Sequence, residues 1–226
     1  MNVVILARDR TPEAVEISRQ CLESISLTVA GLCRLVVVDQ ASCPEFARML
    51  DDYLSDADIY VRNDANVGVA SGRNQGLRLC SEDIITFADN DVVFCTQGWD
   101  NLFRERLYDD GVDIVAPLTN FTSCESQQSD GSDLSDSFVS THFVPGLCMS
   151  LRRSTTCILG PFDERFSPYG YEDTDYCMRA SIHGLRIVVT RNVFVRHQSQ
   201  LVDKGSDQGV AGAESFRRYQ EKWDWM

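Results

Sequence analysis

The sequence predicts a single α/β domain of the Rossmann-like type, with a mixed, mostly parallel sheet flanked by helices. Two observations carry this prediction. First, short continuous apolar runs alternate along the chain with segments whose apolar residues recur at helical spacing, which is typical of a doubly wound sheet. Second, 226 residues are enough for one substantial core, and the hydrophobic and charged fractions of 43% and 24% are close to globular averages.

The first βαβ unit is predicted from two apolar runs. Residues 3–7 and 35–38 are continuously apolar, as expected for buried parallel strands. Between them, apolar residues recur at helical spacing at Ala14, Ile17, Cys21, Leu22 and Ile25. Parallel strands need a crossover connection of this kind, so these segments predict the start of a parallel sheet.

The same alternation continues to residue 116. Strands are predicted at 59–61, 84–88 and 112–116, and helices at 46–54, after Gly68 and at 99–107. In doubly wound sheets, ligands bind beyond the carboxyl ends of the strands, so functional residues should gather there.

The second half of the chain begins with a polar segment. Residues 119–137 are rich in Ser, Asp, Gln and Gly, which predicts a mobile loop that is either an inert surface excursion or a lid over the site. After it we predict a strand at 143–151, a turn-rich stretch at 160–171, a short helix through Met178, strands at 187–189 and 193–195, and an amphipathic helix near 216–223. The chain thus divides into parts 1–118 and 142–226, joined by a loop at 119–141.

The net charge of −13 argues against binding to nucleic acid or to an anionic membrane surface, because both carry negative charge and bind clusters of Lys and Arg. The N-terminal apolar run is too short for a signal peptide, and no stretch approaches the roughly 20 apolar residues that span a bilayer. We therefore expect a soluble, cytoplasmic protein with no transmembrane segment. The nine cysteines include no C-x-x-C pair, so we expect buried free thiols rather than disulfides.

The strongest local signal for chemistry is the triplet Asp89-Asn90-Asp91, which follows a buried strand. A turn at the end of a strand can aim both carboxylates toward one ligand, and hard carboxylate oxygens suit Mg²⁺ or Mn²⁺ bridging a diphosphate. Aspartates are also common as plain turn residues, and the triplet alone does not decide between the two interpretations.

Four segments in the same order resemble family 2 glycosyltransferases and their relatives, the nucleotide-diphospho-sugar transferases of the GT-A fold. They are 36–39 (VVVD), 66–76 (NVGVASGRNQG), 89–91 (DND) and 170–175 (GYEDTD). The resemblance spans nearly the whole chain. It implies a GT-A fold with a nucleotide-binding part at 1–118 and an acceptor and catalytic part at 142–226.

The resemblance implies a pocket for the nucleotide base lined by Ala7, Arg8 and Asp39. A carboxylate at the carboxyl end of a strand can accept from the imide N–H of a pyrimidine, which favours uracil. The alternative is that Asp39 is simply a turn residue.

The segment 66–76 is similar to a glycine-rich, phosphate-proximal entry to a helix, with Asn66, Gly68, Arg73 and Asn74 as donor-binding residues. We expect Arg73 and Asn74 to contact the ligand. The alternative is ordinary helix capping, with the glycines serving only for packing.

By the same resemblance, Asp91 binds the metal, Asp89 binds the metal or the ribose, and Asn90 belongs to the donor site. His197, after the strand at 193–195, is then the third protein ligand. A single His after an apolar strand can equally be a hydrogen-bonded structural residue.

Glu172 and Asp173 match the Glu-Asp motif of the family, which implies a catalytic pair with Asp173 as the general base. Inverting transfer needs a carboxylate that takes the proton of the acceptor hydroxyl. Acidic residues at a helix N-terminus are also favoured electrostatically, and both roles can hold at once.

These residues together predict a metal-dependent glycosyltransferase that uses Mn²⁺ or Mg²⁺. It would move a sugar from a nucleotide-sugar donor, with a UDP-sugar favoured, to a saccharide, lipid-linked or protein acceptor. A sugar-phosphate nucleotidyltransferase ranks second, because residues 7–12 lack the Gly and Lys of a triphosphate-binding loop. A non-catalytic nucleotide-sugar-binding module is the other alternative.

Overall fold

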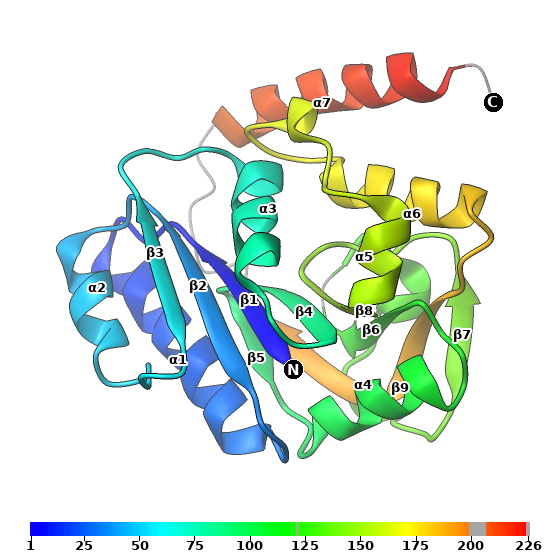
Figure 1. Cartoon of the computed structure of the whole chain (residues 1–226), viewed down its shortest axis with the longest axis horizontal. Coiled ribbons are helices and arrows are strands. Elements are labelled where there is room, and N and C mark those ends of the chain that lie inside the picture. Colours follow the sequence, from blue (N-terminus) through cyan, green and yellow to red (C-terminus); the bar gives the residue numbers. More distant parts are fainter. Residues whose placement is uncertain (121, 199–206, 225–226) are drawn as a thin grey trace.

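The computed structural model describes residues 1–120, 122–198 and 207–224, and within them the chain forms one continuous 9-stranded sheet (Figure 1). The strands are β1 (Asn2–Ala7), β2 (Arg34–Gln40), β3 (Ile59–Asn63), β4 (Ile84–Asp89), β5 (Val92–Phe94), β6 (Ile114–Thr119), β7 (Phe138–Thr141), β8 (Cys148–Arg152) and β9 (Ile187–His197). Their order is β3-β2-β1-β4-β8-β6-β9-β5, and β7 pairs with β9.

The sheet is mixed and mostly parallel, as predicted. β3, β2, β1 and β4 pair in parallel, and β6 pairs in parallel with β9. β8 runs antiparallel between β4 and β6, and β5 and β7 run antiparallel to β9. The carboxyl ends of β1, β2, β4 and β9 therefore lie along one edge of the sheet.

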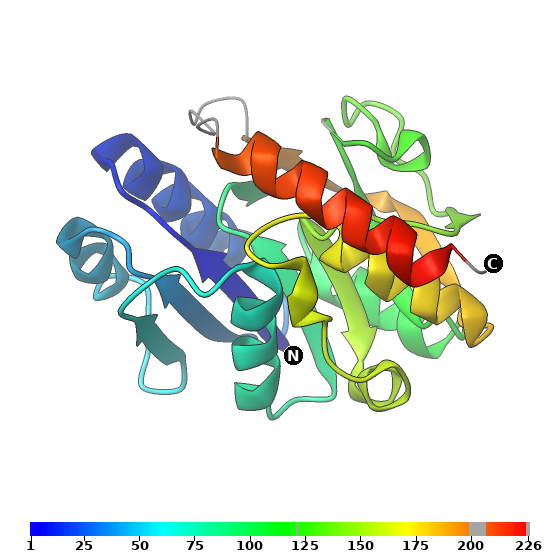
Figure 2. The same cartoon turned by 90° about the horizontal axis from the view of Figure 1, so that it is seen from above.

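Helices cover both faces of this sheet. They are α1 (Pro12–Thr28), α2 (Pro44–Leu50), α3 (Val69–Leu79), α4 (Trp99–Tyr108), α5 (Arg153–Leu159), α6 (Glu172–Ile182) and α7 (Asp207–Trp223), with short 3₁₀ turns η1 (Glu125–Gln127) and η2 (Glu164–Phe166). One core cluster joins α1, α2 and α4 to the sheet, and the other joins α3, α5 and α6. α7 lies outside these layers, over α6 (Figures 1 and 2).

The helix starts follow ordinary capping chemistry where the chain allows it. The side chain of Thr11 accepts a hydrogen bond from the backbone N–H of Ala14, and Pro12 occupies the first turn of α1, where its missing N–H costs nothing. The buried face of α1 includes the apolar residues at helical spacing that predicted it. Trp99 is fully buried in the core at the start of α4.

The structure corrects several predicted elements in the second half. The predicted strand at 143–151 forms only at Cys148–Arg152. The two strands predicted at 187–189 and 193–195 are one strand, β9: β6 pairs with it on both sides of the polar residues, with a shift of register between them, and β7 pairs with it as far as Thr190. β5, β7 and α5 were not predicted, since β5 has only 3 residues and the others carry no clear apolar period.

The segment 119–137 packs more closely than its composition suggests. Gln127 and Cys124 are buried, and Asp136 and Asp133 form ion pairs with Arg106 and Arg191. Its predicted mobility stays a prediction.

Among the nine cysteines, none forms a disulfide, but Cys95 and Cys157 are exposed, contrary to the expectation of buried thiols. No helix within the described ranges is both long enough and apolar enough to cross a membrane.

Candidate active site

Two acidic residues and one histidine converge where β4 and β9 end. One ligand atom from each of Asp89, Asp91 and His197 lies within 4.8 Å of the others. Strand pairing explains this meeting: Val92 of β5 is opposite His197 in the antiparallel register, and the backbone N–H of Gln198 donates to the carbonyl of Asp91 at 2.8 Å. The structure thus brings together three residues that the sequence singled out in two separate segments.

The donor set of this cluster fits a divalent cation. Oδ1 of Asp91 is buried and accepts no hydrogen bond among the described residues, although it lies 3.3 Å from Nε2 of His197. Burial raises the pKa of Asp89, and the nearby Arg73 acts in the opposite direction. Two carboxylates and one imidazole suit Mn²⁺, and the carboxylates also suit Mg²⁺.

Arg73 lies inside the protein and joins two acidic groups. Its guanidinium, with 4% of the side chain exposed, donates to Asp89 at 3.2 Å and to Glu172 at 2.9 Å. It also donates to the carbonyl of Gly146 at 2.9 Å. A Cβ at position 146 would lie 2.3 Å from the guanidinium, so a side chain there would displace Arg73 from this position.

The side chain of Asn74 also forms its hydrogen bonds within the protein. Its amide donates to the carbonyl of Phe162 and to Glu164, and its oxygen accepts from the N–H of Phe162 at 2.8 Å. Ligand contact was expected for Arg73 and Asn74, but both are buried because they lie on the inner face of α3. They tie together the segments around the site.

The entry to α3 follows the glycine-rich pattern, with Gly68 as its N-cap at φ +90°. A Cβ at Gly68 would lie 2.6 Å from Oγ of Ser167, so glycine here allows the loop before α6 to lie close to α3. Asn66 is exposed, and its side chain accepts from the N–H of Gly68 at 3.0 Å.

In the expected base pocket at the ends of β1 and β2, the carboxylate of Asp39 is buried and already hydrogen-bonded within the protein. Asp39 has no exposed surface: one oxygen accepts from the N–H of Ser42 at 2.7 Å, and the other accepts from the hydroxyl of Tyr60 at 2.8 Å and from Arg62. Ala7 is buried, whereas Arg8 is exposed at the same strand end. Any contact of Asp39 with a base would therefore take the place of Arg62, whose side chain is 41% exposed.

Asp9 is a buried acid beside the triplet that the sequence analysis did not identify. Its side chain accepts from the amide of Asn90 at 2.8 Å, and its Oδ2 has no hydrogen-bond partner among the described residues. Asn90 also donates to Ser18 at 2.7 Å, so it points toward α1. Burial raises the pKa of Asp9 to about 7. Its position after β1 was the only signal in the sequence.

Replacing Asp9 with asparagine should weaken the pH dependence of stability. The folded protein keeps a proton on Asp9 that the unfolded chain releases, so the free energy of unfolding should fall as pH rises from about 4 to about 7. Each pKa unit corresponds to about 1.4 kcal/mol. In EDTA, Asp9→Asn should resemble the wild type at pH 4 and unfold at a higher temperature at pH 8, by about 2–4 °C for each kcal/mol of stability regained. Equal melting curves at both pH values would contradict this expectation.

Glu172 and Asp173 form the first turn of α6 and face Gly146 and Arg73. One oxygen of Asp173 accepts from the N–H of Gly146 at 2.8 Å, and the other accepts from the N–H of Thr174 at 2.7 Å. Oε2 of Glu172 is buried without a partner among the described residues, and burial together with the charge of Asp173 raises the pKa of Glu172 to about 7. Through Arg73, this pair is linked to Asp89.

Tyr169 is a second residue that the sequence analysis missed. The pKa of its hydroxyl is raised by partial burial and by the negative charges of Asp89, Glu172 and Asp173. The residue is 40% exposed. An aromatic residue in a turn-rich stretch gave no signal of this position.

Comparison with known proteins extends this description. The model of Glycosyl transferase family 2 matches residues 3–159. A pre-mycofactocin glycosyltransferase of Mycobacterium tuberculosis is 29% identical, over 80% of this chain and 41% of its own. An uncharacterized glycosyltransferase of Bacillus subtilis, YfnE, is 26% identical, over 73% of this chain and 56% of its own. The chain thus spans about half the length of these curated relatives.

Solved structures share the fold at low sequence identity. GalNAc-T7 with UDP, GalNAc and Mn²⁺ superimposes with a TM-score of 0.72 at 14% identity, over 87% of this chain and 43% of that one. The mannosyltransferase PcManGT of Pyrobaculum calidifontis, in complex with GDP-Man and Mn²⁺, gives 0.70 at 17% identity, over 90% and 57%. These likenesses confirm the predicted GT-A fold. Since the family model covers most of the chain, this protein belongs to glycosyl transferase family 2.

Proposed function

We propose that this chain catalyses the metal-dependent transfer of a sugar from a nucleoside-diphosphate sugar to a hydroxyl acceptor. One observation carries the proposal: buried Arg73 joins the cluster of Asp89, Asp91 and His197 to the pair of Glu172 and Asp173. Arg73 thereby fixes the candidate metal-binding residues and the candidate general base relative to each other. Structures with the same fold contain UDP or GDP-Man together with Mn²⁺, which supports the donor class.

In the proposed site, Asp89, Asp91 and His197 would hold Mn²⁺ or Mg²⁺. The bound cation would supply positive charge that offsets the charge of the departing diphosphate. The chain's own part is to present these oxygens and the imidazole in a fixed arrangement. The antiparallel pairing of β5 with β9 and the hydrogen bond from Gln198 to Asp91 hold Asp91 and His197 side by side.

Asp173 would take the proton of the acceptor hydroxyl as that oxygen attacks the sugar, which makes the transfer inverting. Oδ1 of Asp173 accepts from the N–H and the hydroxyl of Thr174, whereas Oδ2 accepts from the N–H of Gly146 and keeps a second lone pair for the acceptor. These hydrogen bonds also fix the rotation of the carboxylate, so that it need not reorganise during reaction.

We further propose uracil as the base that this site prefers. Asp39 would accept from the imide N–H of uracil after Arg62 turns outward, because the guanidinium of Arg62 is partly exposed and the carboxylate itself is not. Guanine offers an N–H donor as well, but on a larger ring system, so the two bases should be distinguished.

The experiment is a panel of UDP- and GDP-sugars incubated with the protein and Mn²⁺, with free UDP or GDP measured. We expect metal-dependent release from UDP-sugars, at a higher kcat/KM than from GDP-sugars. Asp39→Asn keeps the size of the side chain but presents a donor to the base. It should remove the preference for UDP-sugars over GDP-sugars, which we expect to be worth roughly 1–3 kcal/mol, the cost of an unpaired buried polar group. Arg62→Met leaves Asp39 intact and should preserve the preference.

Three outcomes would contradict parts of this proposal. A preference of the wild type for GDP-sugars would refute the uracil assignment. Pyrophosphate release from UTP and a sugar 1-phosphate would instead indicate a nucleotidyltransferase. Tight binding of UDP-sugars with no release of UDP, with or without Mn²⁺, would indicate a non-catalytic binding module.

A further inference from the structure

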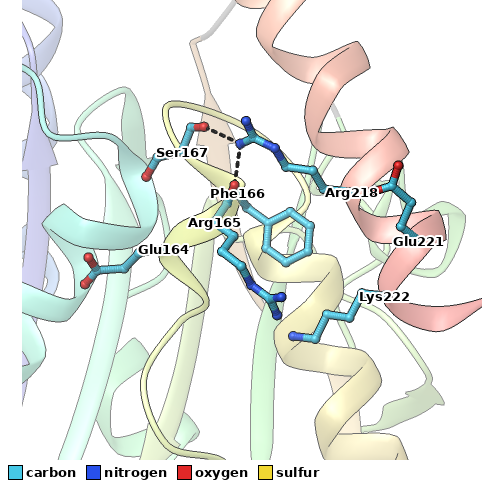
Figure 3. Close-up of a pocket in the computed structure, with 7 residues that line it drawn as sticks. All are labelled: Glu164, Arg165, Phe166, Ser167, Arg218, Glu221 and Lys222. Atoms are coloured by element: carbon cyan, nitrogen blue, oxygen red, sulfur yellow. Dashed lines mark hydrogen bonds between the residues drawn. The ribbon is translucent and has the colours of Figure 1, made fainter.

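Side chains of α7 bind the loop at residues 165–169, which leads into the first turn of α6. The hydroxyl of Ser215, on the buried side of α7, donates to the carbonyls of Tyr169 at 2.9 Å and Phe166 at 3.3 Å. Arg218 donates to the carbonyl of Ser167 at 3.0 Å and to the carbonyl of Arg165, as the dashed lines in Figure 3 show. Backbone carbonyls of this loop thus have side chains of α7 as their partners.

The end of α7 holds the first turn of α6 directly. Nζ of Lys222 lies 2.6 Å from Oδ1 of Asp175, and the indole N–H of Trp223 donates to the same oxygen at 3.1 Å. Arg179 donates to the other oxygen at 3.0 Å. The carboxylate of Asp175 has no exposed surface, and it lies two residues after Asp173 in the same turn.

This first turn needs support from outside α6. It begins at Tyr171, which has φ +68°, an uncommon and strained conformation for a residue with a side chain. Such conformations cost on the order of 1–3 kcal/mol and persist when the surroundings enforce them. The ring of Tyr171 packs on Phe216 and Tyr219 of α7, with ring centroids 5.3 and 5.6 Å apart.

The contact between α7 and the loop is polar more than apolar. A cavity of about 540 Å³ opens between them, lined by residues 164–167 of the loop and by Arg218, Glu221 and Lys222 of α7 (Figure 3). At this cavity the loop and α7 are not in contact, so the charged hydrogen bonds to Asp175 contribute to the docking beside the aromatic packing of Tyr171. Removing one of them would leave a buried carboxylate less well paired.

We propose that Lys222 and Trp223 are positioning residues for sugar transfer. By binding Asp175 they fix the first turn of α6, and with it the carboxylate of Asp173, against Gly146. This inference rests on the proposed function, because it assigns the held carboxylate a role in proton transfer. The cluster of Asp89, Asp91 and His197 lies on other elements and is linked to the first turn of α6 through Arg73, so a shift of that turn should affect it less than it affects Asp173.

The test compares Trp223→Phe, which removes the indole N–H together with one ring of the side chain, and Lys222→Met with the control Arg217→Ala on the same helix. Arg217 is exposed, and its pair with Glu221 is only a 3.8 Å surface contact. In UDP-sugar hydrolysis with Mn²⁺, kcat should fall roughly 10-fold for Trp223→Phe and up to about 10²-fold for Lys222→Met, because small misplacements of a reacting group cost this much. The donor KM and the Mn²⁺ dependence should stay at wild-type values, as should all parameters of Arg217→Ala.

Two further measurements separate positioning from general destabilisation. Lys222→Arg keeps the cation and should retain most of the rate. Amide hydrogen exchange in residues 171–178 should accelerate in Lys222→Met but not in Arg217→Ala, with the strands of the sheet unchanged.

Wild-type kcat and wild-type exchange in Lys222→Met and Trp223→Phe would overturn the inference while leaving the proposed function in place. A raised donor KM with unchanged kcat would also overturn it. If the wild type itself neither binds UDP with Mn²⁺ nor hydrolyses any UDP- or GDP-sugar, the proposed function fails, and the positioning role in transfer fails with it. The exchange measurement then still shows whether α7 holds α6.

Discussion

Asp91→Ala should abolish the Mn²⁺-dependent stabilisation of the protein by UDP. The wild type should melt at a higher temperature with UDP and Mn²⁺ together than with UDP in EDTA. The gain corresponds to about 2.7 kcal/mol when the ligand is present at one hundred times its dissociation constant. Loss of one of three ligand side chains should remove this increment and lower the release of UDP from a UDP-sugar to background. Thermal unfolding with and without metal measures the first effect directly.

The apo protein supplies an internal check on this prediction. Oδ1 of Asp91 is buried without a hydrogen bond among the described residues, and Asp89 and Asp9 lie near enough to repel it. Asp91→Ala should therefore melt at the wild-type temperature or above it in EDTA. Asp56→Ala, which removes an exposed carboxylate between α2 and β3, should keep the full metal-dependent increment. If UDP stabilised the wild type as much in EDTA as with Mn²⁺, the metal hypothesis would be refuted.

The sequence predicted the parallel part of the sheet well, because its buried strands are unbroken apolar runs. Residues 3–7, 35–38 and 84–88 all lie within observed strands, and the order of elements follows from the alternation. The meeting of Asp91 with His197 was only implied by the resemblance. It depends on β5, a strand of 3 residues that no periodicity reveals.

The orientation of side chains on α3 could not be predicted from the glycine-rich pattern. A cation near a phosphate-binding helix start is expected to face a ligand, but Arg73 lies on the inner face of α3 and meets Asp89 and Glu172. Those partners are 16 and 99 residues away in sequence. Long-range pairing of this kind is decided by packing, which local propensity does not encode.

The role of the C-terminal helix was hidden for a similar reason. Its amphipathic pattern predicts that one side is buried, and the structure confirms a helix there, beginning earlier than predicted. The pattern says nothing about what the buried side contacts. That Lys222 and Trp223 share one oxygen of Asp175 depends on the crossing of α7 over α6, which only the folded chain defines.

Asp173→Asn should lower sugar transfer by about 10²–10⁴-fold, with the dissociation constant of UDP and Mn²⁺ nearly unchanged. The substitution removes the carboxylate that would accept the proton of the acceptor hydroxyl. The nucleotide part and the cluster of Asp91 and His197 lie on other strands, so donor binding should survive. The measurement is a pair of experiments: transfer or hydrolysis kinetics with a UDP-sugar, and titration of UDP in the presence of Mn²⁺.

The structure also sets the control for this substitution. An asparagine can offer its oxygen to the N–H of Gly146 or to that of Thr174, but its NH₂ group must then face the other N–H. Because two donors then face each other, the free energy of unfolding should fall by about 1–3 kcal/mol. Rates must therefore be compared well below the melting temperature of the variant. Glu172→Gln is the matched control, because Glu172 has a pKa raised to about 7 and a neutral side chain there resembles its protonated form. Its rate should fall much less. Near-normal transfer by Asp173→Asn would reject Asp173 as the base, and a larger loss in Glu172→Gln than in Asp173→Asn would move that role to Glu172.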